Sequence, residues 1–167
     1  MRILGIDPGY AIVGYGALEY EKTKFHTVEF GAITTDAHTD FQDRLKEVYQ
    51  QLDIVIKRVK PQAFATEKLF FTTNQKTVIQ VAQARGVILL CARMNDIPVY
   101  EYTPLQIKQA VAGYGKAEKK QVQEMVKILL HLEKVPKPDD TADALAVAIC
   151  HAHSYRSKLF KQIGKTL

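Results

Sequence analysis

Four carboxylates in this sequence have a type and a spacing suited to hydrolytic chemistry. Asp7 ends a short apolar run and is followed at once by Pro-Gly, and Glu67 ends a second apolar run, AFATE. Asp140 and Asp143 lie three residues apart near the start of an apolar helical segment, so both face one side of the helix. If the two apolar runs are neighbouring strands, the sheet brings Asp7 and Glu67 close together.

Taken singly, these carboxylates also have structural explanations. Asp7 before Pro-Gly suits a turn. Asp139 or Asp140 could cap a helix, and Asp143 would be favourable in its first turn. Capping needs only one aspartate, however, and Glu67 at the end of a buried strand needs solvent or a partner to avoid a large desolvation cost. No basic residue follows Asp143 closely in the sequence, which favours a metal partner.

A cluster of carboxylates is most readily kept ionised by divalent cations. Ligand sets made only of oxygen select hard metals such as magnesium or manganese. Two such ions, roughly 3.5 to 4 Å apart, can activate water on one side of a phosphate and stabilise the leaving oxygen on the other. The chemistry indicated is phosphoryl transfer without a protein nucleophile.

The hydrophobic pattern predicts one α/β domain that would position these residues. Three consecutive β-rich runs joined by short turns indicate an antiparallel meander. The predicted strands are 2–7, 12–20, 25–34, 63–67 and 98–102, and the predicted helices are 40–60, 73–95, 104–112, 118–131 and 139–153. The domain is expected to span 1–153, followed by a basic C-terminal tail, 154–167, that can be mobile.

Positive charge is unevenly distributed along the 167 residues, whose formal net charge is +5. Residues 57–120 carry 11 basic and 4 acidic side chains, and 154–167 carry 4 basic and no acidic ones. This distribution favours a polyanionic partner such as nucleic acid. Ordinary solvated lysines would explain the charge alone equally well.

Cysteine usage and the absence of a long apolar run indicate a cytoplasmic protein. Cys91 and Cys150 each lie within an apolar run, which suits small buried hydrophobes better than a disulfide or a zinc site. The first residues lack the apolar stretch of a secretory signal, and no run approaches membrane-spanning length.

Four segments together resemble the RuvC family of bacterial Holliday junction resolvases: GIDPGYAIVGYG, EKLFFTTN, QARG and DDTADALAVAICHAH. Their order and spacing match the family through about residue 153. The resemblance implies a ribonuclease H-like fold, a five-stranded mixed sheet flanked by helices on both sides. It also implies that Asp7, Glu67, Asp140 and Asp143 are the catalytic and metal-binding residues. Some relatives carry histidine where this chain has Asp140, and Asp139 matches no functional position.

The same resemblance implies a magnesium-dependent endonuclease that resolves four-way DNA junctions in recombination and repair. Family members are homodimers, and the two-fold symmetry suits paired symmetric nicks that leave 5′-phosphate and 3′-hydroxyl ends. Two Mg²⁺ ions are expected at each site, with Mn²⁺ able to substitute. A branch-migration helicase complex of RuvA and RuvB is the expected further partner.

Candidate DNA contacts lie in two segments. In RuvC-like proteins an aromatic residue at the position of Phe70 stacks on bases near the junction centre, and either Phe70 or Phe71 could instead belong to the core. Lys108 and Lys119 match basic positions that contact DNA in the family. Lys116 and Lys120 are candidates by local chemistry alone, near two glycines and a helix start. Arg85, in QARG, could reach DNA or serve a dimer-forming helix.

Three other functions deserve comparison. An actin-like or sugar-kinase-like ATPase would share the DPGYAIVGYG hairpin, but it needs a second related domain, and no GxxxxGK[ST] loop occurs. A catalytically silent DNA-binding module would not need four carboxylates, whose charge opposes phosphate unless metal is present. A nuclease of the same fold acting on other nucleic acids is separated only by the whole-chain resemblance.

Overall fold

A five-stranded sheet forms the centre of the protein. The computed structural model describes residues 1–68 and 78–163, with side chains followed as far as residue 155. The sheet order is β3-β2-β1-β4-β5. β1, β2 and β3 form the predicted antiparallel meander, whereas β4 and β5 continue the sheet in parallel with β1. The strands are β1 (Arg2–Asp7), β2 (Ile12–Glu21), β3 (Lys24–Thr34), β4 (Ala63–Glu67) and β5 (Val99–Tyr102).

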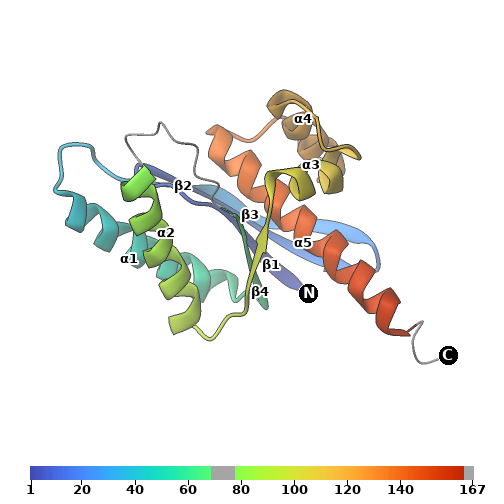
Figure 1. Ribbon diagram of the computed structural model, residues 1–167, viewed down its shortest axis with the longest axis horizontal. Coiled ribbons are helices and arrows are strands. Elements are labelled where there is room, and N and C mark those ends of the chain that lie inside the picture. Colours follow the sequence, from blue (N-terminus) through green and yellow to red (C-terminus); the bar gives the residue numbers. More distant parts are fainter. Residues whose placement is uncertain (69–77, 164–167) are drawn as a thin grey trace.

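Helices cover both faces of the sheet, as predicted (Figure 1). α1 and α2 pack on one face, and α3, α4 and α5 lie on the other. The helices are α1 (Phe41–Val59), α2 (Val78–Met94), α3 (Pro104–Ala112), α4 (Lys119–Leu129) and α5 (Asp139–Ile163). The mixed sheet with helices on both sides confirms the predicted fold class.

Alternation along β1 divides the core into two hydrophobic clusters. Ile3 packs with the α3, α4 and α5 side, whereas Leu4 and Ile6 pack with α1 and α2. All three side chains are fully buried. A strand buried on both faces requires an apolar run, and that is the pattern of RILGI in the sequence. The apolar run ends where the strand leaves the core, at Asp7.

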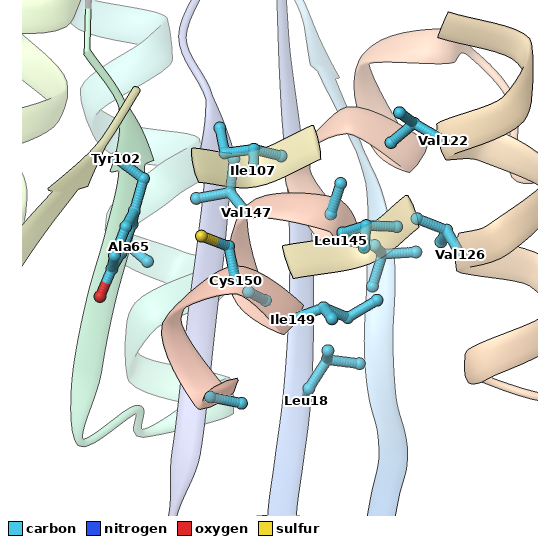
Figure 2. Packing of buried hydrophobic residues seen from close by; sticks show 14 of the residues in the cluster. Leu18, Ala65, Tyr102, Ile107, Val122, Val126, Leu145, Val147, Ile149 and Cys150 are labelled. Carbon is cyan, nitrogen blue, oxygen red and sulfur yellow. The ribbon is translucent and has the colours of Figure 1, made fainter. Parts of the chain in front are cut away.

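α5 forms the centre of the cluster that contains Ile3. Leu145 and Ile149 are fully buried, and Figure 2 shows them beside Leu18 of β2 and Val126 of α4. Burying side chains of this size stabilises the fold by roughly 1.5 to 3 kcal/mol each. The packing fixes α5 across the sheet and thereby sets the position of its N-terminus.

The helices around the site have well-defined ends. α3 begins at a capping box in which the Thr103 hydroxyl accepts from the Gln106 amide at 3.2 Å and the Gln106 side chain accepts from the Thr103 amide at 2.8 Å. It ends at Gly113, whose φ of 85° is a left-handed conformation that favours glycine. The bounds predicted for this helix, 104–112, are confirmed.

The structure corrects one predicted helix end and does not describe another. The predicted end of the last helix at 153 was wrong, because α5 continues to Ile163. Residues 154–163 contain neither glycine nor proline, so nothing in this stretch stops a helix before Gly164. The division into a domain of 1–153 and a tail of 154–167 stays a prediction. α2 begins at Val78, and the predicted start at 73 lies outside the described residues.

Two further expectations concern the cysteines and membranes. Cys91 and Cys150 are both buried and unpaired, as predicted. None of the helices in the described part of the chain has the length and hydropathy needed to span a membrane.

Candidate active site

Parallel pairing of β1 and β4 brings two of the predicted carboxylates to one end of the sheet. The register pairs Ile6 with Thr66, and Asp7 and Glu67 are the next residue on each strand. On the other side of β1, Asp7 pairs with Gly14 of β2. The sheet therefore holds the Asp7 and Glu67 backbones on neighbouring strands, which meets the condition under which the sequence brings them close together.

Close packing of α5 on the sheet brings the other two carboxylates toward the same end. A Cβ atom at Gly14 would lie 2.0 Å from the backbone oxygen of Asp140, and one at Gly5 would lie 2.1 Å from that of Ala144. Only glycine permits an approach this close. In addition, the Thr141 hydroxyl donates to the Gly31 carbonyl of β3 at 3.1 Å. The start of α5 is thus fixed directly over β2.

The four carboxylates, Asp7, Glu67, Asp140 and Asp143, are named here the carboxylate edge, and they act on one another electrostatically. Burial, together with the negative charges of Asp143, Asp140 and Glu67, raises the pKa of Asp7 to about 8. Burial also raises the pKa of Glu67, and the charge of Asp143 raises it further. Burial dominates at Asp143 as well and raises its pKa despite a hydrogen bond from Lys119. The fold concentrates negative charge where water is partly excluded.

Lys119, the first residue of α4, is a cation paired with this edge. Its Nζ lies 2.9 Å from Asp143 Oδ2 and 3.7 Å from Asp139 Oδ2. Its charge lowers the pKa of Asp7 and of Glu67, although burial outweighs it at both. One ammonium therefore offsets only part of the repulsion.

The donor set fits a hard divalent cation. All the candidate ligands are carboxylate oxygens, which magnesium and manganese prefer. In the described part of the chain, no three Asp, Glu, His or Cys side chains already form a closed metal-binding group. The carboxylates repel one another, and only Asp143 among them forms an ion pair with Lys119. A divalent cation would offset this repulsion.

A pocket of about 190 Å³ adjoins the carboxylate edge. Glu67 and Asp143 line it together with two of the predicted DNA-contacting lysines, Lys108 and Lys119. The charge of Lys108 also lowers the pKa of Glu67. The remaining walls of the pocket are apolar and come from α3, α4 and α5: Pro104, Ile107, Val122 and Ala146. Basic and acidic side chains face one cavity, an arrangement suited to a phosphate bound through a cation.

The other predicted DNA contacts lie elsewhere. Lys116 and Lys120 are exposed and line no part of this pocket. Arg85 pairs with Glu101 of β5, and its side chain is only 15% exposed, which favours a structural role over a free phosphate contact. Phe70 and its alternative Phe71 lie outside the described residues.

Two polar residues near the site were not among the sequence-predicted site residues. Asp139, set aside as matching no functional position, shares Lys119 with Asp143 and also accepts from Lys137 at 2.5 Å. Arg44 was missed in α1, where it is buried behind the turn that follows Asp7. It lies four residues before Val48 on the buried stripe of that helix. A charged residue in an apolar stripe is a signal that could have identified it.

Comparisons with known proteins give matches over nearly the whole chain. Residues 3–151 match the family model described as Crossover junction endodeoxyribonuclease RuvC. The chain is 58% identical to the protein of that name from Alkaliphilus metalliredigens, over 96% of this chain and 99% of the relative. It is similar to the solved RuvC structure from Thermus thermophilus, with TM-score 0.87 and 34% identity over 95% of this chain and 97% of that one. A second structure, Thermus thermophilus RuvC in complex with Holliday junction substrate, gives TM-score 0.86 and 32% identity over 94% and 96%.

Proposed function

Because the chain belongs to the RuvC family of crossover junction endodeoxyribonucleases, we propose that it resolves Holliday junctions in DNA recombination and repair. The resemblance seen in the sequence is confirmed by this membership. The family is one of divalent-metal-dependent nucleases, so the rival ATPase and the catalytically silent module are set aside. The observation that carries the proposal is the carboxylate edge, where the ends of β1 and β4 meet the start of α5.

We propose Asp7, Glu67, Asp140 and Asp143 as the catalytic and metal-binding residues, with Mg²⁺ as the physiological cation. Two ions are expected at each site, and Mn²⁺ should substitute because it accepts the same oxygen ligands. When bound, such cations supply a water nucleophile at neutral pH and stabilise the leaving oxygen. The carboxylates hold the cations at the end of the sheet, and burial raises the cost of leaving their charges unneutralised.

The basic residues would bind the backbone of the DNA. Lys108 and Lys119 line the same pocket as Glu67 and Asp143, so a phosphate near the carboxylates would lie within reach of both ammonium groups. Lys119 would then exchange its contact with Asp143 for one with phosphate, as a divalent cation takes over neutralisation of the carboxylate. Lys116 and Lys120 are proposed as peripheral phosphate contacts, Phe70 as a stacking residue, and Arg85 as the weakest candidate.

The assembly is proposed to be a homodimer on a four-way junction. One active site per subunit then suffices for two symmetric nicks, because a two-fold protein matches the pseudo-two-fold junction. Hydrolysis by metal-activated water would leave 5′-phosphate and 3′-hydroxyl ends that a ligase can seal. A helicase complex of RuvA and RuvB is the proposed partner, in the cytoplasm.

The test compares cleavage of a synthetic four-way junction with cleavage of a linear duplex of the same sequence, with and without magnesium. Wild type should cut only the junction and only with metal, whereas Asp7→Asn should bind the junction without cutting it. Asp96→Asn is the matched control, since Asp96 is exposed and has a left-handed φ of 56° that asparagine tolerates. Equal cutting of both substrates, or an active Asp7→Asn, would contradict the proposal.

A further inference from the structure

The turn between β1 and β2 follows Asp7 directly and is tightly built. A Cβ atom at Gly9 would lie 2.2 Å from the backbone oxygen of Ile12, so the chain folds back without room for a side chain there. The first residue after β3, Thr35, closes the turn from the side: its amide donates to the Ala11 carbonyl at 3.0 Å and its hydroxyl donates to the Tyr10 carbonyl at 2.7 Å.

Arg44 of α1 stands behind this turn and contacts it twice. Its Nε donates to the Thr35 hydroxyl at 2.9 Å, and its guanidinium lies 4.8 Å from the centre of the Tyr10 ring. Because a hydroxyl has a single proton, accepting from Arg44 leaves the Thr35 proton directed at the Tyr10 carbonyl. The Tyr10 ring also packs edge-on against Phe41, with 5.8 Å between the ring centres. Arg44 thus orders both the backbone and the side chain of the turn.

An arginine at this place is costly for the fold alone. Arg44 is only 8% exposed, and a buried cation is unfavourable unless it is paired. It also lies in the first turn of α1, where the helix dipole disfavours positive charge. Within the described residues it forms no ion pair with a carboxylate, and its side chain instead contacts Thr35 and the Tyr10 ring of the turn.

We propose that Arg44 is a positioning residue for Asp7: acting through Thr35 and Tyr10, it fixes the turn after β1 and so holds the Asp7 carboxylate within the carboxylate edge. The inference rests on the proposed function, since it assigns Arg44 a part in the same site. Fixing this turn matters because Asp7 is repelled by three neighbouring carboxylates and would otherwise move away from them. Arg44 itself touches no reacting atom.

The test uses variants that differ at a single hydroxyl. Thr35→Val removes the hydroxyl that links Arg44 to the Tyr10 carbonyl but keeps the shape of the side chain, whereas Thr35→Ser keeps this hydroxyl. Arg44→Gln removes the cation, and Arg58→Gln is the control on the same helix, because Arg58 pairs with Glu29 away from the turn. Four quantities are measured: amide hydrogen exchange of residues 9–12 without metal, Mn²⁺ affinity by electron paramagnetic resonance, junction affinity without metal, and single-turnover cleavage with magnesium.

We expect Thr35→Val and Arg44→Gln to speed exchange in the turn, to weaken Mn²⁺ binding and to slow cleavage by about 10-fold or more, since small misplacements of reacting groups cost up to roughly 10²-fold. Junction affinity should stay within about threefold of wild type. Thr35→Ser and Arg58→Gln should behave as wild type in all four measurements. Rescue by serine would distinguish a hydrogen-bonded relay from simple packing.

Two results would overturn the inference. The first is unchanged exchange and Mn²⁺ affinity in Thr35→Val. The second is weaker junction binding in Arg44→Gln with Thr35→Val unaffected, which would make Arg44 a DNA contact. If Arg44→Gln fails to fold, Thr35→Val against Thr35→Ser decides the question. A wild type that does not cut junctions would instead contradict the proposed function, while exchange and Mn²⁺ affinity would still test the role of Arg44.

Discussion

The fold places Glu29 and the carboxylate edge in opposite electrostatic environments. Glu29 of β3 accepts from Arg58 of α1 and from the Tyr15 hydroxyl, and the Arg58 hydrogen bond lowers the pKa of its carboxyl. At the carboxylate edge, burial and mutual repulsion raise the pKa of Asp7 to about 8. Glu29 is thus neutralised within the chain, whereas the carboxylate edge keeps a repulsion that, under the proposed function, a cation from outside would neutralise.

The largest effect expected from this contrast is on cleavage. Glu67→Gln and Asp143→Asn each keep the shape of the side chain but remove a charged oxygen ligand, and we expect junction cleavage to fall by about 10³-fold, comparable to the loss of a preorganised group that stabilises a transition state. Glu29→Gln is the matched substitution at the paired acid and should leave cleavage within about twofold of wild type. A large loss in Glu29→Gln would remove the distinction between the two groups.

The second effect concerns the pH dependence of stability in the metal-free protein. The folded-state pKa of Asp7 is raised from 3.8 to about 8, so the folded state binds more protons than the unfolded one between these values. The free energy of unfolding should therefore fall as pH rises from about 4 to 8. Asp7→Asn should flatten this slope and stabilise the metal-free protein at pH 8 by about 2 to 4 kcal/mol, since each pKa unit corresponds to about 1.4 kcal/mol.

Urea unfolding of wild type and Asp7→Asn at pH 5 and pH 8, in the presence of a chelator, measures this difference. Added magnesium should raise the stability of wild type at pH 8 and have little effect on Asp7→Asn, because a ligand that binds only the folded state stabilises it. A wild type that becomes more stable from pH 5 to pH 8 without metal would show that Asp7 is not repelled in the way described.

A smaller effect separates two lysines of the same region. Lys119→Gln removes the ammonium shared by Asp143 and Asp139, and cleavage should fall by about 10- to 100-fold, because a hydrogen bond to a charged group contributes roughly 1.5 to 3 kcal/mol. Lys116→Gln should weaken junction binding slightly and reduce its salt dependence by about one counterion. Cleavage rates at saturating protein and binding curves at several salt concentrations distinguish the two outcomes. Equal effects of Lys119→Gln and Lys116→Gln on cleavage would contradict a specific role for Lys119 at the carboxylate edge.

The smallest effect is expected on stability when Glu29, the acid paired with Arg58, is replaced. Glu29→Gln breaks the ion pair with Arg58, and its side chain is 28% exposed, so the loss of stability at neutral pH should be about 1 kcal/mol or less. The pKa of Glu29 is lowered in the fold, so its contribution is present above the unfolded pKa and lost as pH falls through the folded one. Thermal unfolding at pH 7 and pH 3 checks this: the variant and wild type should differ at pH 7 and converge at pH 3.

Local sequence patterns were enough to predict the strands and helices that carry the proposed site residues. Apolar runs that end in a carboxylate placed Asp7 and Glu67 at the ends of strands, whereas the pairing of these strands was only a condition until the fold showed it. The fold class followed from the alternation of strand and helix patterns together with the family resemblance. The site roles themselves, including those of Asp140 and Asp143, stay predictions until the variants are measured.

Interactions between distant segments were not predictable in the same way. Arg85 pairs with Glu101 across sixteen residues, and only the packing of α2 against β5 brings the two together. Arg44 was overlooked because helical periodicity identifies apolar positions, and its partner Thr35 lies in the loop before the helix. The close approach of α5 to Gly14 depends on how a helix and a sheet pack, which no local pattern specifies.

The most direct test of the account is to titrate the Asp7 carboxyl itself. Protein labelled with ¹³C at aspartate carboxyl carbons, with Asp7→Asn to assign the signal, gives the Asp7 pKa with and without magnesium. Without metal the pKa should be about 8, and magnesium should lower it well below neutrality, because a bound cation favours the ionised form. A pKa near the ordinary value of 3.8 without metal, or one that magnesium does not move, would contradict a carboxylate edge that relies on an external cation.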